Sequence, residues 1–366
     1  MNRRYDIDWL RTIAIGLLLI YHVAIGFQPW GLMIGFITND ESWSSLWLPM
    51  SMLNVWRIPF LFFVSGMGVY FAMQHRTWRQ LIHERSLRIL VPFVFGTVCI
   101  FPVSLLILQQ YYGWETEYQV NPGHLWFLGN IFVYVIVLAP VFYYLKQNTQ
   151  GKFVSLLRSM LRTPLGLIPF VGVFIAEVLI MKPFPYELYA MTWHGFALGF
   201  LAFFCGFCFV LCGDVFWKMI TKWRWMFLIL ALGLFLGRSF VFGTGNPLYL
   251  LVVESDCWIF TVFAFSYRYL NRPGKALSYL SEAAYPVYIN HMIFIYLGSW
   301  LIFPLEIPVW MKFISLLFFT VAGCFAAFEC VRRVGILRVF FGLKFETVKN
   351  RQVHPRRREN AALKAG

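Results

Sequence analysis

The chain has 366 residues, of which 60% are hydrophobic and only 13% are charged, against roughly 25% charged in an ordinary soluble domain. This composition excludes a soluble globular protein and a disordered one, and it predicts an all-α polytopic membrane protein. The net charge of +14 would fit a nucleic-acid partner, but the basic residues gather between apolar runs. We therefore expect no nucleic acid, and instead an attraction to anionic membrane lipids.

Ten apolar runs are long enough to cross a bilayer as helices, since a crossing needs roughly 20 mostly apolar residues. In chain order they cover about 9–30, 46–73, 89–111, 124–145, 164–181, 190–212, 224–243, 247–267, 283–304 and 309–331. Continuous Leu, Ile, Phe and Val runs favour helices over the alternating strands of a membrane barrel. The first run lacks a small-residue cleavage site, so we expect a membrane span there and no cleaved signal peptide.

The basic residues alternate between connections. Most of the 31 Lys and Arg residues fall in every second connection and near the C-terminus, whereas the other connections keep only Lys182 and Lys312 beside several acids. The positive-inside rule therefore predicts that both termini are cytoplasmic. We expect residues 1–343 to form one transmembrane domain and 344–366 a basic, disordered cytoplasmic tail.

The seven cysteines all fall in the predicted spans or at their ends. Cys205, Cys208 and Cys212 share one helix face, but a metal or redox site needs thiolates, which an apolar bundle disfavours. We expect them to be small packing residues, and we expect no metal site.

Ionisable side chains at bilayer depth indicate functional sites, because their burial is costly. In the first span Arg11 and His22 lie eleven residues apart, which places them on one helix face, roughly 16 Å apart along the axis. We expect both to face one solvated passage for a long anionic donor, with the reactive end at His22. The alternatives are that Arg11 snorkels or pairs with Asp8, and that His22 is a hydrogen-bonded core histidine.

Three further arginines stand out. Arg57 lies deep in the second run, two residues before Pro59, and should face a cavity or a carboxylate. Arg85 and Arg88 lie one turn apart at the inner mouth of the third run, in position to grip a phosphate. Ordinary positive-inside charge is the alternative for this pair.

Other polar residues lie in the outer half of the bundle or near its middle. They are Glu177, Arg238, Glu254, Asp256, His291, and His124 with Trp126 at the start of the fourth run. Either Glu254 or Asp256 is placed to pair with Arg57 or Arg238. These residues predict a polar cavity that opens outward, opposite a basic entrance on the inside.

With these motifs in this order, the whole chain resembles the membrane acyltransferase-3 family. Arg11 and His22 are similar to its R-x10-H signature, Arg57 with FFVSGMG to its second-helix motif, and Arg85-Ser-Leu-Arg88 to its R-x-x-R. The segments that begin at His124 and Tyr285 also agree. Among relatives the chain looks most like the glucan biosynthesis protein C group, which succinylates periplasmic glucans.

The resemblance implies a multi-pass enzyme of the bacterial inner membrane that moves an acyl group from cytoplasmic acyl-CoA to a hydroxyl of an extracytoplasmic glycan. Acyl-CoA is then a co-substrate, and no cofactor is permanently bound. Arg11 and His22 are implied in catalysis, and Arg85 and Arg88 at the CoA site. To these we add Arg57 as a catalytic group. The residues expected around the acceptor are His124, Trp126, Arg238, Glu254 and His291.

Several alternatives stay open. His22 acts as a general base or carries the acyl group itself, and the acyl group is acetyl or succinyl. Many relatives continue into a soluble outer domain that this sequence lacks, so we expect the outer loops and the cavity mouth to recognise the acceptor. A small-solute or lipid-linked substrate transporter is the rival function, because charges within spans also mark transport pathways. The sequence shows no convincing internal repeat, which lowers that possibility, and it leaves the oligomeric state open.

Overall fold

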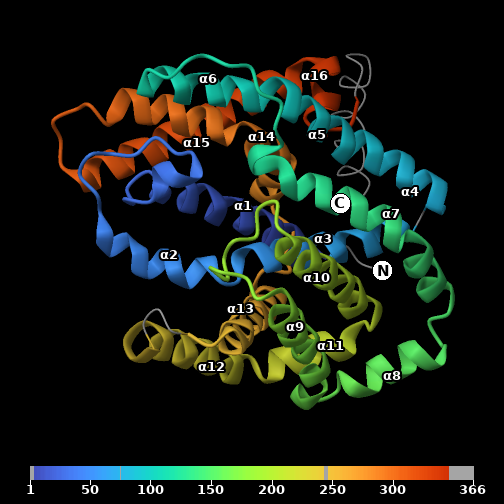
Figure 1. The fold of residues 1–366 in the computed structure, drawn as a ribbon. Coiled ribbons are helices and arrows are strands. Elements are labelled where there is room, and N and C mark those ends of the chain that lie inside the picture. The colour runs from blue at the N-terminus through green and yellow to red at the C-terminus, as the bar shows by residue number, and fades with distance from the viewer. Residues whose placement is uncertain (1–3, 75, 243–245, 346–366) are drawn as a thin grey trace, which may run out of the picture.

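The computed structural model describes residues 4–74, 76–242 and 246–345, and in these ranges all regular structure is helical (Figure 1). Within them, nine helical segments are long and apolar enough to cross a membrane. The expectation of an all-α polytopic bundle is confirmed. The tail predicted at 344–366 lies outside the described residues, apart from its first two.

The helices follow the predicted spans closely. In chain order they are α1 (Tyr5–Ile25), α2 (Trp47–Asn54), α3 (Arg57–Met73), α4 (Trp78–Arg85), α5 (Val91–Phe95), α6 (Phe101–Tyr112), α7 (Trp126–Gln147) and α8 (Lys152–Met160). They continue with α9 (Ile168–Met181), α10 (Trp193–Leu211), α11 (Asp214–Lys222), α12 (Arg224–Gly237), α13 (Leu248–Tyr269), α14 (Lys275–Ile302), α15 (Val309–Arg333) and α16 (Gly335–Phe340). Short 3-10 turns begin at residues 31, 44, 123 and 164, and five-residue π-helical turns begin at 86, 96 and 238.

Three spans differ in detail from the prediction. The second is broken between α2 and α3, whereas the third extends from Trp78 through α4, α5 and α6 to Tyr112. The ninth, predicted at 283–304, falls in the 28-residue α14, which is not among the nine apolar segments. Its sequence explains this, because polar residues such as Asn290 and His291 dilute its apolar character. Both are buried, so α14 hides its polar groups inside the bundle.

Helix α1 lies at the centre of the bundle. It packs against α3, α13, α14 and α15, and Figure 1 shows it enclosed by them. Leu10 and Ala14 on this helix are fully buried. Any polar side chain on the enclosed faces of α1 therefore needs a partner or a cavity inside the protein.

The closest packing joins α3 to α10, and glycines on both helices make it possible. A Cβ on Gly66 would lie 1.9 Å from the carbonyl oxygen of Phe203, and one on Gly206 would lie 2.1 Å from that of Phe63. Small residues allow such backbone approach in a membrane bundle, where van der Waals packing holds helices together. Stacked rings join α10 to α7 as well, with Phe142 and Phe207 at 3.8 Å between centroids.

This contact predicts a sharp difference between two glycine-to-alanine substitutions. Gly66→Ala should prevent α3 and α10 from closing, and lower the melting temperature by many degrees or abolish recovery of folded protein. Gly16→Ala on α1 should leave the melting temperature unchanged or slightly higher, because nothing lies within 4 Å of its Cβ position. Thermal melting of both purified variants, followed by size-exclusion chromatography, checks this. Equal melting temperatures would contradict the packing described.

Candidate active site

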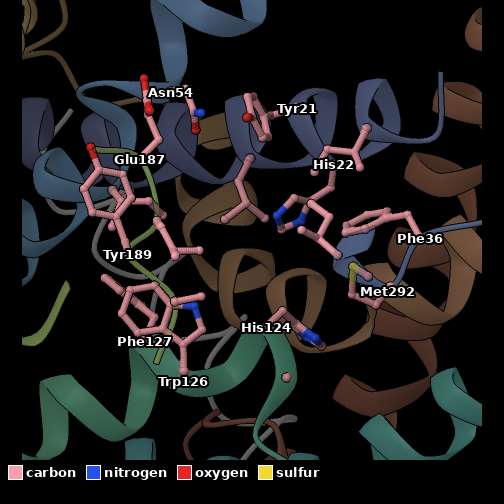
Figure 2. Close-up of a pocket in the computed structure, with 18 of the residues that line it drawn as sticks. Tyr21, His22, Phe36, Asn54, His124, Trp126, Phe127, Glu187, Tyr189 and Met292 are labelled. Carbon is pink, nitrogen blue, oxygen red and sulfur yellow. The ribbon is translucent and has the colours of Figure 1, made fainter. Parts of the chain in front are cut away.

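A cavity of about 970 Å³ opens among α1, α3, α6, α7 and α14, beside the loop that joins α9 to α10 (Figure 2). Its lining includes Tyr21, His22, Arg57, His124 and Trp126. These residues come from three separate stretches of the sequence, and four of them belong to the predicted site. The structure therefore brings His22, Arg57, His124 and Trp126 together around one space.

His22 is engaged through one of its two ring nitrogens. Its Nδ1 lies 2.8 Å from Nε2 of His291, and the two rings are nearly parallel, with 5.0 Å between centroids and 8° between their planes. His291 is fully buried, and its Nδ1 donates to the backbone carbonyl of Tyr288 at 2.6 Å. His124 completes the cluster, with its ring centroid 4.8 Å from that of His291. Its Nε2 donates to the carbonyl of Ile289 at 3.2 Å.

Arg57 is a buried cation with open donors. It is the first residue of α3, because the chain breaks after α2, and Pro59 fits in the first helical turn, where a missing N–H costs little. The guanidinium lies 3.6 Å from the ring centroid of Tyr21, and the residue is only 5% exposed. Its Nε and Nη1 have no hydrogen-bond partner in the described part of the chain. Arg57 can therefore still receive an anion or a developing negative charge.

The loop between α9 and α10 covers one side of the cavity and carries residues that the sequence did not single out. Glu187 and Tyr189 line the cavity, and burial raises the pKa of Glu187 above its ordinary value. Tyr189 donates to the carbonyl of Val55, which ties the loop to the break before Arg57. Loop acids carry no helical periodicity, so nothing in the sequence placed Glu187 at the site.

A buried hydrogen-bonded pair, Glu177 and His194, anchors the same loop at its two ends. Glu177 near the end of α9 accepts a hydrogen bond from Nδ1 of His194 at 2.9 Å, and Nε2 of His194 donates to the carbonyl of Tyr186 at 3.0 Å. Glu177 was predicted as a buried ionisable residue, whereas its partner was missed because His194 begins an apolar helix. The pair satisfies Glu177 structurally and keeps it out of the cavity lining.

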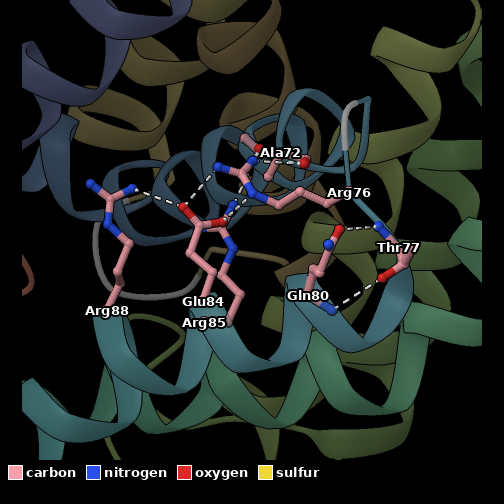
Figure 3. A network of polar contacts seen from close by, with 8 residues as sticks. Ala72, Arg76, Thr77, Gln80, Glu84, Arg85 and Arg88 are labelled. Atoms are coloured by element: carbon pink, nitrogen blue, oxygen red, sulfur yellow. Dashed lines mark hydrogen bonds and ion pairs between the residues drawn. The ribbon is translucent and has the colours of Figure 1, made fainter. Parts of the chain in front are cut away.

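At the opposite end of α1, a basic cluster forms around Gly68. Arg85 Nη2 donates to the Gly68 carbonyl at 3.4 Å, and Arg11 Nη2 lies 3.1 Å from the position that a Cβ on Gly68 would take. Glu84 pairs with Arg76 at 3.1 Å and with Arg88 at 3.4 Å (Figure 3). One carboxylate thus serves two of the guanidinium groups, and the cluster keeps a net positive charge suited to an anion.

The basic cluster lies outside the lining of this cavity. Arg11, Arg85 and Arg88 are absent from the lining, which on α1 extends no further toward Arg11 than Leu18 and on α3 no further than Leu61. The structure therefore does not bring Arg11 and His22 to one cavity, and the expected passage between them stays a prediction. Leu18 and Leu61, at this end of the cavity, are only 4% and 5% exposed.

Three residues predicted at the acceptor lie outside the cavity lining. His291 is behind His22, while Arg238 and Glu254 pair with each other through two bonds of 2.7 and 2.9 Å. Arg238 also donates to the carbonyl of Ser51 at 3.1 Å, which ties it to α2. Of the pairings that the sequence allowed, the structure therefore shows Glu254 with Arg238. Arg57 has no carboxylate partner among the described residues. Asp256, two residues further along α13, is buried with Oδ2 unpartnered.

The comparison with family models bears directly on this site. The model described as the acyltransferase domain, acyltransferase-3, matches residues 4–329, which include α1 to α14 and most of α15. The chain belongs to the acyltransferase-3 family. It is therefore a membrane acyltransferase. Neither the curated proteins nor the solved structures include a significant match.

The pair between Arg238 and Glu254 in this acyltransferase should be structural. Glu254→Leu alone leaves a buried guanidinium without its carboxylate, and we expect a loss of about 3–5 kcal/mol of stability. Replacing both partners, as Arg238→Met with Glu254→Leu, should recover most of that loss because no charge stays buried alone. Melting temperatures of the two single variants and the double variant measure the coupling. Additive losses would show that the pair is not a structural unit.

Proposed function

We propose that the protein is a transmembrane O-acyltransferase that moves an acetyl or succinyl group from cytoplasmic acyl-CoA to a hydroxyl of an extracytoplasmic glycan or other carbohydrate-type acceptor. In this proposal it is a multi-pass protein of the bacterial inner membrane with both termini in the cytoplasm. The family match supports the acyl transfer, and the distribution of basic residues supports the orientation.

The observation that carries the proposal is the position of His22. It lines a cavity large enough for an acceptor, and one ring nitrogen is held by His291 while the other has no partner in the described chain. A histidine with a free ring nitrogen at a cavity wall is suited to remove a proton from a hydroxyl. The family's R-x10-H signature falls on the same residue.

The proposed reaction balances without a further reactant. His22 takes the proton of the acceptor hydroxyl as its oxygen attacks the thioester carbonyl, so an oxygen–carbon bond forms. The carbon–sulfur bond then breaks, and the CoA thiolate leaves with the proton that His22 returns. Arg57 is close enough to act electrostatically on His22, and its open donors are suited to stabilise the oxyanion that develops between these steps.

The basic cluster at Gly68 is the proposed site for the CoA phosphates. Arg85 and Arg88 are suited to bind phosphate through several donors, and Arg11 lies in the same cluster. The acyl-carrying arm then has to cross roughly 16 Å along α1 to reach His22. Because the cavity lining reaches no further toward Arg11 than Leu18 and Leu61, the proposal requires a passage between α1 and α3 to open at this level when the donor binds.

The cavity lining fits a carbohydrate acceptor better than a purely apolar one. Trp30, Trp47 and Trp126 offer aromatic faces, while Gln28 and Asn54 offer amides. Flat aromatic surfaces with a few well-placed polar groups are the usual means of binding and orienting a polar organic ligand. A succinyl group would in addition place a carboxylate near Arg57, whereas an acetyl group needs only a small pocket.

The test combines product analysis with a matched histidine control. Mass spectrometry of surface glycans, with and without the gene, identifies the acyl group and its carrier from one mass shift. In lipid-embedded purified protein, His22→Ala should lower transfer from labelled acyl-CoA by about 100-fold or more, since a general base typically supplies that much. The exposed His83→Ala on α4 should not change the rate. Unchanged transfer by His22→Ala would refute the mechanism.

The donor site makes a separate prediction at Gly68. In Gly68→Ala the new methyl group would lie 3.1 Å from the Arg11 guanidinium and displace it. We expect the KM for acyl-CoA to rise several-fold while the KM for the acceptor stays the same. Gly16→Ala is the control on α1, with open space around its Cβ position. A change confined to the acceptor KM would place the CoA site elsewhere.

The alternative function, transport of a small solute or a lipid-linked substrate, has its own assay. Proteoliposomes loaded with an unlabelled sugar or sugar-lipid and given the labelled form outside should show no counterflow without acyl-CoA. Rapid counterflow in the absence of acyl-CoA, with no labelled ester formed in its presence, would favour transport over acyl transfer.

A further inference from the structure

We propose that His291 is a positioning residue, which holds His22 in the tautomer that carries hydrogen on Nδ1 and so directs the basic Nε2 into the cavity. This inference rests on the proposed function and deepens it. It assigns to His291 a role behind the reacting histidine, in place of the acceptor contact expected from the sequence.

The backbone carbonyl of Tyr288 determines which nitrogen of His291 carries hydrogen. The carbonyl oxygen of Tyr288 can only accept, so Nδ1 of His291, 2.6 Å away, must carry a hydrogen. In a neutral imidazole the other nitrogen then has a lone pair. Nε2 of His291 is therefore an acceptor, and it lies 2.8 Å from Nδ1 of His22.

The position of the hydrogen on His291 in turn determines the position of the hydrogen on His22. Because Nε2 of His291 accepts, Nδ1 of His22 must donate, and the hydrogen of a neutral His22 sits on Nδ1. Nε2 of His22 is left with the lone pair, and in the described ranges the His22 ring forms its hydrogen bond through Nδ1 alone. Figure 2 shows the His22 ring directed into the cavity, opposite His124. Proton abstraction and acyl transfer to His22 both need this lone pair, so the arrangement serves either role.

The competing arrangement would place a second proton on His291 and reverse the bond. His291 is fully buried, and no carboxylate in the described chain forms a hydrogen bond with it. Its other neighbours are the ring of His124 and, beyond His22, the guanidinium of Arg57. An added cation would be desolvated and would face another positive group, so the neutral form of His291 is favoured.

Packing holds the two rings in this geometry. The rings are nearly parallel, and both belong to long helices, α1 and α14, that pack against each other. His124 is held to the carbonyl of Ile289, and Tyr288 donates in turn to the carbonyl of His124. The ring of His291 therefore has neighbours on two sides and cannot rotate freely. This is the arrangement by which an outer residue orients a reacting imidazole, as the aspartate does in a serine-protease triad.

The decisive experiment reads the tautomer directly. Nitrogen-15 NMR of the full-length protein in lipid, with labelled histidine and a His22→Gln sample to assign the signal, distinguishes a protonated from an unprotonated Nδ1. In the wild type we expect His22 to carry hydrogen on Nδ1. In His291→Leu, which has no acceptor, we expect the population to move toward hydrogen on Nε2. A wild-type His22 protonated on Nε2, or a His22 signal unaltered in His291→Leu, would overturn the proposal.

Kinetics of the same variants separate positioning from simple support of the fold. His291→Leu should lower kcat by between about 10-fold and about 10⁴-fold, with the KM of both substrates nearly unchanged. His291→Gln, which offers an amide oxygen as acceptor, should recover part of kcat. The control Ser299→Ala removes a buried, unpartnered hydroxyl from α14 and should not change kcat. Equal kcat for the Leu and Gln variants at equal melting temperatures would contradict positioning.

The two proposals fail in distinguishable ways. If the wild type transfers no acyl group from any acyl-CoA, the proposed function is wrong, and the NMR result alone then decides whether His291 fixes the tautomer. If transfer occurs but the His22 tautomer does not depend on His291, the function stands and the positioning role is rejected.

Discussion

The cost of placing an ionisable side chain in an apolar helix bundle organises this structure. Each such group must find a charge partner, a hydrogen bond or a cavity, because bilayer and packed core offer no water. Arg238 with Glu254 and His194 with Glu177 solve the problem in pairs, and both pairs lie outside the cavity lining. His22 instead forms one hydrogen bond, with the neutral ring of His291, and keeps its other ring nitrogen free for the cavity. That difference separates the structural groups from the reactive one.

Hydropathy alone predicted most of the fold. Nine of the ten predicted runs correspond to segments apolar enough to span, and α1 and α3 with their polar residues fall where expected. The break before Arg57 was not visible, because neither Val55 nor Trp56 is a helix-breaking residue such as Gly or Pro. Its cause is tertiary, since the carbonyl of Val55 is taken by Tyr189 from a distant loop. The amphipathic α8 and α11 were missed because they are too short and too charged to cross.

The candidate site was predictable in some of its members, such as His22, Arg57, His124 and Trp126, but not in its pairings. Helical spacing placed Arg11 and His22 on one face, and the depth of Arg57 predicted its cavity. Helical periodicity gives no information on partners in other helices, so the bonds from Glu254 to Arg238 and from His22 to His291 emerged only from the packed structure. The same limit explains why Arg11 lies outside the cavity that His22 lines. A helical stripe fixes the direction of its side chains, whereas the extent of the cavity depends on how α1 packs against α3.

Arg57 is a buried cation that contacts an aromatic ring in place of a carboxylate. Its guanidinium rests on the face of Tyr21, an interaction that offsets part of the desolvation cost without neutralising the charge. A carboxylate in the same place would stabilise the cation more, but it would also occupy the donors and oppose any anion arriving from the cavity. An aromatic face leaves Nε and Nη1 without hydrogen bonds, in a water-poor site where such donors act most strongly. The stability given up at Arg57 is therefore what leaves its charge available to the reaction centre beside His22.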